Sequence, residues 1–538
     1  MPATRPLPDS PNLEQLKRQA KDLLRAARAA DPTALARFRM LPSLSQTSDD
    51  ELDRTSLALH DAQSVIAREH GFASWNALRE RVEELTLGFD DAVREFIEAA
   101  TDGRTTRAER LLALHPRIAG ANVHTALVLG DVAAVESYLA RHPAFVREAG
   151  GPRGWEPLHY VCYDSLGRTS ITSADGLVAI ARRLLELGAD ANSRFPWEHH
   201  AVRRPVLWGA THVTRLLPLA ELLLQSGADP NDGVTLPLSA SAGDLETLEL
   251  LRTYGADPNQ RWATDGTATL YAILDWSTTN VGVRWLLEHG ADADPVCATN
   301  GETPLHIAAR RWDVATMELL VQRGADISRR RADGRTPYAV AELNGNGAVA
   351  EWLRARGASD ELEPVDRLVA ACGRGDRAAA EAMLAAHPGL RAEITTDHYA
   401  ALHRAAEQGD VGTLALLLDC GFDPNVGDEG IGKTALHSAA MAGRPDAVRI
   451  LLARGASPQI RDREFHGQPL VWAAEGSRSH QERARDYAEV GQLLLDAGSP
   501  VEWEPGDEPA EGILEILAEW RRGSDDAHGA MRSTSGRD

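Results

Sequence analysis

The stretch ETPLHIAARRWDVATMELLVQRGADIS, residues 302–328, predicts a helix–turn–helix unit. Thr303 can cap the first helix, and Pro304 can take its first position, where the missing N–H costs nothing. A second amphipathic helix is expected over residues 313–323. Gly324 then supplies the left-handed residue that commonly ends a helix. The stretch therefore reads as two short helices followed by a turn.

The closing Gly-Ala-Asp segment, or a close relative behind an apolar doublet, recurs along the chain. Its glycines are Gly188, Gly227, Gly255, Gly290, Gly324, Gly357, Gly421, Gly455 and Gly498. Most steps between them lie near 33–34 residues, and the step of 64 equals about two such units. A fixed period of this size indicates a stack of similar supersecondary units. Such a stack presents a long surface instead of enclosing a reaction.

Helix, turn, helix, glycine cap and a hairpin-like finger together resemble the ankyrin repeat, from about residue 91 to residue 501. The matching helix openings lie at 157–159, 303–306, 336–338, 401–403 and 434–437. The resemblance implies an all-α ankyrin-repeat solenoid of about twelve repeats. It also implies that four histidines bridge neighbouring fingers by hydrogen bonds: His159, His306, His403 and His437. Three units end in His-Pro where Gly-Ala is expected, and proline halts the helix there: His115-Pro116, His142-Pro143 and His387-Pro388.

The two ends of the chain do not repeat. Residues 1–88 predict a small helical module, similar to the leader that precedes the repeats of bacterial ankyrin-repeat proteins; that likeness rests on residues 12–24 and 62–75. The predicted organisation is this module, a solenoid over 89–507, an amphipathic capping helix over 508–522 and a disordered tail over 523–538.

Composition restricts the class of protein. The net charge is −22 over 538 residues, which argues against a nonspecific grip on nucleic acid. Only three of the 57 basic residues are lysine, which is typical of GC-rich bacterial coding. The four cysteines form no CxxC pair, and no run approaches 18 apolar residues. The sequence thus predicts a cytoplasmic protein without a membrane segment.

No motif for catalysis, for a cofactor or for a metal stands out. A Walker loop, HExxH and a GxSxG elbow are all absent from the sequence. His199-His200 beside Glu198 is the best metal candidate, but adjacent histidines rarely converge on one ion, so a solvated finger is favoured. Cys162 stands where the repeat has alanine, which predicts a small buried side chain. We therefore predict neither an enzyme nor a metal or cofactor site.

The aromatic residues are more informative. The chain has 12 Trp against 8 Phe, and several fall on fingers or at the ends of first helices, where ankyrin stacks meet partners. Trp, Tyr and Arg dominate binding hot spots. Packing or chance explains any single one of them better than binding does, but the set as a whole favours a binding face. The predicted protein-binding residues are Trp155, Tyr163, Asp164, Trp197, Trp208, His212, Arg261, Trp262, Asp275, Trp276, Arg310, Arg311 and Trp312.

Three functional hypotheses follow. The favoured one is a scaffold that binds a protein partner, preferably a basic one, along the concave face and fingers. The alternative is a small-ligand-binding protein or enzyme, whose pocket would be roofed by inserts at 164–175 and 193–204, with Asp164, His199 and His212 as polar groups. The third is a nucleic-acid adaptor in residues 1–88, because residues 1–40 carry a net charge of +4; their charges alternate with acids, however, so a solvated helix face is favoured.

Overall fold

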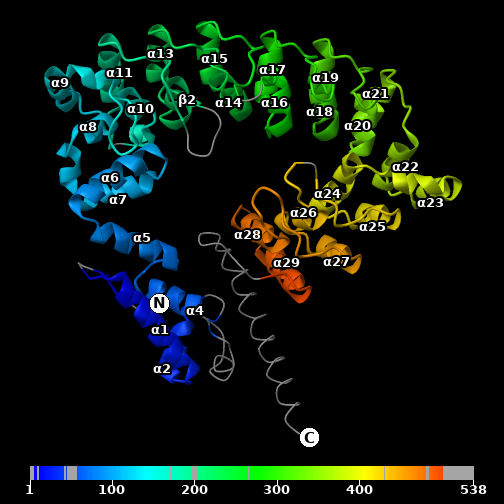
Figure 1. The fold of residues 1–538 in the computed structure, drawn as a ribbon, viewed down its shortest axis with the longest axis horizontal. Coiled ribbons are helices and arrows are strands. Elements are labelled where there is room, and N and C mark those ends of the chain that lie inside the picture. Colours follow the sequence, from blue (N-terminus) through cyan, green and yellow to red (C-terminus); the bar gives the residue numbers. More distant parts are fainter. Residues whose placement is uncertain are drawn as a thin grey trace. The chain divides into compact units, whose positions relative to one another are not determined.

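The computed structural model describes residues 5–8, 11–41, 44, 57, 59–169, 171–196, 203–263, 266–428, 430–479 and 484–500. Their regular secondary structure is almost entirely helical (Figure 1). They group into two compact units, one mainly of residues 81–334 and the other mainly of residues 12–80 and 335–500. Trp197, His199, His200 and the proposed C-terminal cap and tail lie outside the described residues.

The described residues before the repeating part include the helices α1 (Leu13–Arg28), α2 (Pro32–Phe38), α4 (Leu59–Glu69) and α5 (Trp75–Thr86). The side chain of Asn12 caps α1 by accepting from the backbone N of Gln15 at 3.0 Å. Arg37 of α2 and Glu69 of α4 form a bidentate ion pair, with N–O distances of 2.6 and 2.8 Å. The expected helices are therefore present, while their forming a module that ends at residue 88 and the other domain limits stay predictions.

Helix pairs follow one another through the rest of the described chain. Within residues 81–334 the pairs are α6 (Phe89–Thr101) with α7 (Thr105–Leu114), α8 (Val123–Leu129) with α9 (Val132–Arg141), α10 (Pro157–Cys162) with α11 (Ala174–Glu186), α12 (Val206–Trp208) with α13 (Leu217–Gln225), α14 (Thr235–Ala242) with α15 (Leu245–Thr253), α16 (Thr269–Trp276) with α17 (Val281–Glu288), and α18 (Pro304–Arg311) with α19 (Val314–Gln322). Within residues 335–500 they are α20 (Pro337–Leu343) with α21 (Gly347–Ala355), α22 (Pro364–Gly373) with α23 (Arg377–Ala386), α24 (Tyr399–Gln408) with α25 (Val411–Asp419), α26 (Ala435–Met441) with α27 (Pro445–Ala453), and α28 (Pro469–Ser479) with α29 (Ala484–Asp496). The described residues thus hold twelve pairs, as the period predicts.

The residues predicted to begin and end the helices do so in the structure. Thr303 and His306 form a capping box at the start of α18, with the Thr303 N to His306 Nδ1 distance 3.2 Å. Gly324 follows α19 at a φ of +99°, a conformation that L side chains rarely adopt. His115, His142 and His387 end their helices, and a short 3-10 turn beginning at proline follows each one. The His-Pro stop is therefore confirmed.

An asparagine ladder links successive units. Asn259 donates from Nδ2 to the carbonyl oxygen of Gly290 at 3.1 Å and accepts from the backbone N of Asp292 at 2.7 Å. The same pair of bonds is made by Asn192, Asn231 and Asn425 toward the unit that follows each. The asparagine thus satisfies the exposed backbone of the next glycine cap, which explains the regular finger register.

The two inserts in residues 81–334 both pack onto neighbouring helices. In the first, the turn Ser165–Arg168 is anchored by the Ser165 hydroxyl, which donates to the carbonyl of Ala100 at 2.7 Å. The second contributes the antiparallel pair β1 (Arg194–Pro196) and β2 (Arg203–Pro205), the only two-stranded sheet in the described residues. A π-helical turn, Gly209–Val213, continues from α12. Inserted residues therefore change which side chains reach the surface.

Candidate partner-binding surface

Two tryptophans of one repeat form an aromatic pair, in which Trp262 is half-buried and Trp276 is exposed. Trp262 lies in the finger, which is closed by a 2.8 Å bond from the Trp262 backbone N to the carbonyl of Thr267. Trp276 ends α16 and is 44% exposed. Their ring centroids lie 4.9 Å apart with planes at 70°, the edge-to-face arrangement that aromatic pairs prefer. The pair is thus rigid, apolar and open to solvent on one side.

Charged groups of this repeat and of the next flank the pair. Asp275 forms a 2.7 Å ion pair with Arg310 of α18. Arg310 also approaches Glu302 at 3.4 Å, and Glu302 accepts a 2.8 Å hydrogen bond from the Tyr271 hydroxyl. Arg331 reaches the same carboxylate at 3.1 Å. Because Glu302 is almost wholly buried, it holds these groups in place.

Arg311 and Trp312 continue the surface along α18. The indole N–H of Trp312 donates to the carbonyl of Leu274 at 2.7 Å, so Trp312 bridges two repeats. Arg311 is exposed and donates to the carbonyl of Ser277 at 3.2 Å. A hollow of about 260 Å³ lies beside the finger and is lined by Arg261, whose guanidinium closes the turn on Gly266. The structure thus gathers Arg261, Trp262, Asp275, Trp276, Arg310, Arg311 and Trp312 on two adjacent repeats.

The other predicted binding residues are mostly buried. Trp155 is 8% exposed, and Tyr163 and Asp164 are 0% exposed, so the expectation that they face a partner is wrong. The cause is the hairpin β1–β2, which places Phe195 against Trp155 at 4.3 Å and against Tyr163 at 4.8 Å between ring centroids. The Tyr163 hydroxyl donates to the carbonyl of Pro205 at 2.9 Å. These side chains hold the insert on the repeat.

Trp208 and His212 are half-buried beside this cluster. The Trp208 ring stacks on His212, with centroids 5.5 Å apart and planes at 10°, and the Arg204 guanidinium lies 4.2 Å from the centroid of Trp208. Burial lowers the pKa of His212 to about 4 and also lowers that of His159 to about 4. Burial raises the pKa of Asp164 well above its usual value. These shifts report desolvation within a packed cluster.

The hydrogen bond to a neighbouring finger that the resemblance implies is seen for His403 and His437, whereas the bond of His306 to Thr303 lies at the start of its own helix. His306 bonds to Thr303, the Nε2 of His437 lies 3.1 Å from the carbonyl oxygen of Gly467, and that of His403 lies 3.3 Å from that of Val426. Neither ring nitrogen of His159 has a hydrogen-bond partner in the described structure, and its ring instead meets Phe195 edge-on. Cys162 is fully buried as expected, and burial raises the pKa of its thiol.

The described residues offer little for the other chemistries. Among them, no group of three or more His, Cys, Asp and Glu side chains could hold a metal ion. No helix in the described part of the chain has the length and apolarity needed to span a membrane. In the N-terminal helices Lys17 pairs with Glu14 and Arg25 with Asp22, which favours a solvated helix face over a nucleic-acid contact.

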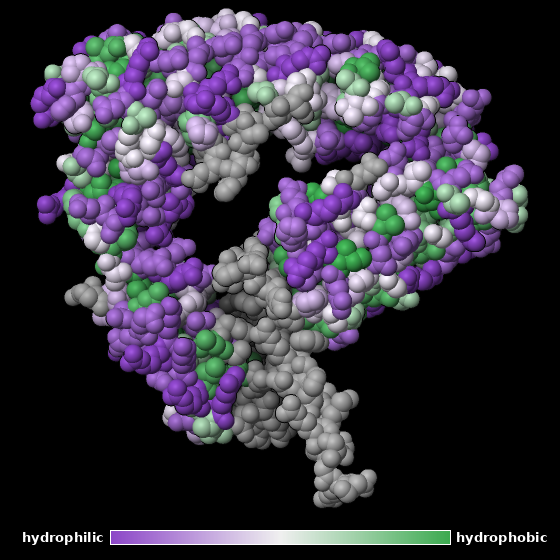
Figure 2. All heavy atoms as spheres, viewed as in Figure 1, coloured by the Kyte–Doolittle hydropathy of each residue, from purple (hydrophilic) through white to green (hydrophobic). Residues whose placement is uncertain are grey.

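Sequence reasoning missed one exposed aromatic residue, Phe465, which is 66% exposed. It stands in a finger and meets Trp472 of α28 edge-on, with centroids 6.2 Å apart. The sequence contained a signal for this residue, because Phe465 is an aromatic residue shortly before the glycine of its finger, as Trp262 is in the finger that contains Gly266. On the face drawn in Figure 2, hydrophilic residues predominate and hydrophobic ones occur in small groups, so isolated aromatic anchors are informative.

Comparison with known proteins identifies the repeats. A family model for ankyrin repeats (three copies) matches residues 236–331, 276–363, 368–462 and 402–498. With the twelve helix pairs, this confirms an all-α ankyrin-repeat solenoid preceded by helices. Ankyrin repeats mediate protein–protein interaction.

Several curated proteins are similar to this chain. They include the ankyrin repeat and KH domain-containing protein mask-1 of Caenorhabditis elegans, 28% identical over 46% of this chain and 10% of its own length. Rabankyrin-5 of Mus musculus is 31% identical over 30% of the chain and 14% of its own length. The E3 ubiquitin-protein ligase KEG of Arabidopsis thaliana is 25% identical over 52% of the chain and 16% of its own length. The chain therefore spans only a small part of these relatives, and the likeness concerns their repeats.

Proposed function

We propose that this protein is a non-enzymatic interaction scaffold that binds a protein partner at the surface formed by Trp262, Trp276 and the flanking charged residues. The observation that carries the proposal is the Trp262–Trp276 pair, in which the exposed Trp276 at the end of a first helix packs edge-to-face on the half-buried Trp262 of the finger. Rigid aromatic side chains ringed by polar groups are typical of binding hot spots. We further propose a cytoplasmic, bacterial setting, on the composition alone.

The expected partner presents a basic segment with an apolar side chain. The chain carries a net charge of −22, which steers basic partners toward it. Asp275 is exposed at the edge of the aromatic pair, while Arg310 and Arg331 are already paired with carboxylates. An apolar group of the partner would pack on the tryptophans, and a neighbouring cation of the partner would approach the exposed Asp275 carboxylate.

The proposal can be tested by affinity capture from the native host with wild-type protein and single variants, quantified by mass spectrometry. Trp276→Ala should reduce capture of the wild-type partner by about 30-fold in affinity, because truncating a hot-spot residue costs about 2 kcal/mol. Leu245→Ala is the matched control, since Leu245 is 48% exposed but belongs to no aromatic pair. Equal capture by wild type, Trp262→Ala and Trp276→Ala would refute the proposal.

A further inference from the structure

A second aromatic pair joins Phe465, which lies in a finger, to Trp472 of the following helix α28, and the side chain of Asp462 holds this finger in place. Asp462 accepts hydrogen bonds from the backbone N of Phe465 at 2.6 Å and of Gly467 at 2.8 Å, and from the Trp472 indole at 3.0 Å. His466 adopts the left-handed region at a φ of +51°. This conformation is unusual for a residue with a side chain, and strained positions of this kind cluster at functional sites.

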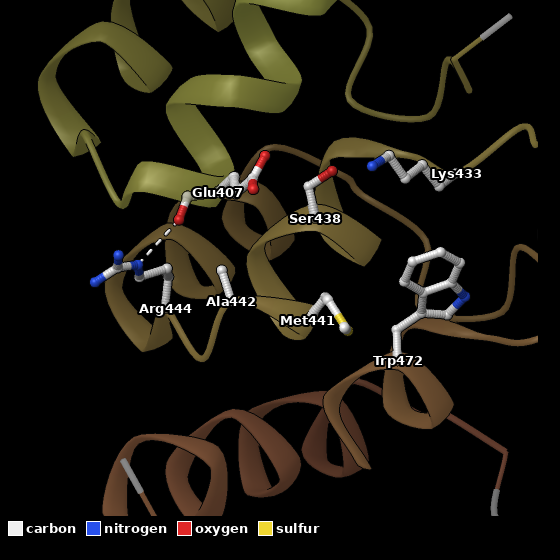
Figure 3. A pocket seen from close by; sticks show the side chains of 7 residues that line it. All are labelled: Glu407, Lys433, Ser438, Met441, Ala442, Arg444 and Trp472. Carbon is white, nitrogen blue, oxygen red and sulfur yellow. Dashed lines mark hydrogen bonds between the residues drawn. The ribbon is translucent and has the colours of Figure 1, made fainter. Parts of the chain in front are cut away.

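A cavity of about 300 Å³ opens beside Trp472 (Figure 3). Its apolar wall is formed by Trp472 and by Met441 at the end of α26. Its polar edge carries Glu407, Ser438 and Lys433, which face the same space in Figure 3. The cavity therefore combines an apolar side with a row of hydrogen-bonding groups.

Ser438 is the feature that points to a ligand. The residue is only 4% exposed, and its hydroxyl oxygen is buried without a hydrogen-bond partner in the described structure. Buried hydroxyls are normally satisfied, because leaving one unpaired costs free energy. The Ser438 hydroxyl points into the cavity (Figure 3), so a bound polar group could satisfy it.

Lys433 gives the cavity its charge. Its ammonium lies 6.0 Å from the centroid of the Trp472 ring and has no ion-pair partner among the described residues. The nearby carboxylates of Asp428 and Asp462 are occupied by backbone N–H groups, those of Gly432 and Gly467 among them. Arg444 adds a second cation at the far side, where its Nε donates to the backbone carbonyl of Glu407. Glu407 itself is exposed, so its carboxylate can turn to solvent.

We propose that this cavity binds a carboxylate side chain from an acidic segment of a protein partner. The carboxylate would accept from the Lys433 ammonium and the Ser438 hydroxyl, and an apolar neighbour in the same segment would pack against Trp472 and Phe465. The proposal rests on the proposed function only in taking a protein segment as the ligand. It concerns a different site and an opposite charge from the Trp262–Trp276 surface.

The test is a selection of random displayed peptides on the full chain, followed by affinity measurements with the best synthetic peptide. Peptides selected on wild type should carry Asp or Glu next to an aromatic or aliphatic residue. The best of them should bind Lys433→Met at least tenfold more weakly and Ser438→Ala severalfold more weakly. It should bind Glu407→Gln two- to threefold more tightly, because that change removes a negative charge from the cavity edge. Circular dichroism and thermal melting would verify that each variant is folded.

Opposite results would overturn the inference. They are selection of Lys- or Arg-rich peptides, weaker binding to Glu407→Gln, or an affinity unchanged by Lys433→Met. Trp276→Ala should leave the peptide affinity within twofold of wild type. If that variant instead abolished peptide binding while Lys433→Met did not, the peptide would occupy the first surface; the proposed function would stand and the carboxylate site would fail. Conversely, loss of binding only in Lys433→Met would support this site even if partner capture by Trp276→Ala were normal.

Discussion

Trp155 and Tyr163 lie in the same parts of a repeat as Trp262 and Trp276, a finger and the end of a first helix, yet Trp155 and Tyr163 are buried whereas Trp262 is half-buried and Trp276 is exposed. In each repeat one aromatic residue lies in the finger and the other at the end of the first helix. The difference comes from the following finger. After Tyr163 it carries the β1–β2 hairpin, whose Phe195 covers both rings, whereas Trp276 keeps 44% of its surface exposed. The part of the repeat in which an aromatic residue lies does not determine its exposure. The neighbouring finger does, because it either covers the ring or leaves it open to solvent.

The largest expected contrast is in stability. Trp155→Ala should lower the free energy of unfolding by about 3–5 kcal/mol, since it empties a packed aromatic cluster. Trp276→Ala should lower it by less than about 1 kcal/mol, because the ring is half in solvent. Urea unfolding followed by circular dichroism measures both. Similar losses in the two variants would show that the hairpin is not what separates the two regions.

Acidification should affect the buried cluster through His212 and His159. Burial lowers their folded-state pKa values to about 4, below the unfolded value of about 6.5. Their contribution is therefore complete above pH 6.5 and is lost as the pH falls toward 4, because the unfolded chain binds the proton first. Between pH 7 and pH 5 each should account for about 2 kcal/mol of lost stability.

The variant His212→Gln should accordingly lose less stability than wild type over this range, by about that amount. Asp164→Asn should act in the opposite direction. Burial raises the pKa of Asp164, so protonation of this group on acidification favours the folded state, and the variant lacks that compensation. The free energy of unfolding of each variant, measured at pH 7 and at pH 5, tests these expectations. The same pH dependence in wild type and His212→Gln would show that the histidine is not desolvated.

The smallest expected effect lies at the edge of the Trp262–Trp276 pair. Asp275→Asn breaks an ion pair with Arg310 in which the two side chains are 57% and 32% exposed. Exposed pairs of this kind contribute less than about 1 kcal/mol, so the melting temperature should change little. Affinity for a basic partner should fall modestly, and the fall should shrink at high salt. A large loss of stability would show that Asp275 is part of the core.

Much of the fold could be predicted from local sequence because ankyrin units depend on local signals. Gly324, Thr303 and the ladder asparagine Asn259 each act through neighbours fixed by the repeat period, so counting from each glycine places them correctly. The burial of Tyr163 could not be predicted in this way. It depends on Phe195, 32 positions further along, folding back through a hairpin whose path no local pattern specifies. Phe465, by contrast, could have been singled out from the sequence, because it is an aromatic residue in a finger.

We expect a protein partner to bind at the Trp262–Trp276 pair and not at the covered cluster of Trp155 and Tyr163. Hydrogen–deuterium exchange of the full chain, with and without the captured partner, tests it without any substitution. We expect slower exchange in peptides covering residues 259–277 and 302–312, with exchange in residues 155–166 and 203–212 unchanged. Protection confined to residues 155–212, with none around Trp262 and Trp276, would contradict it.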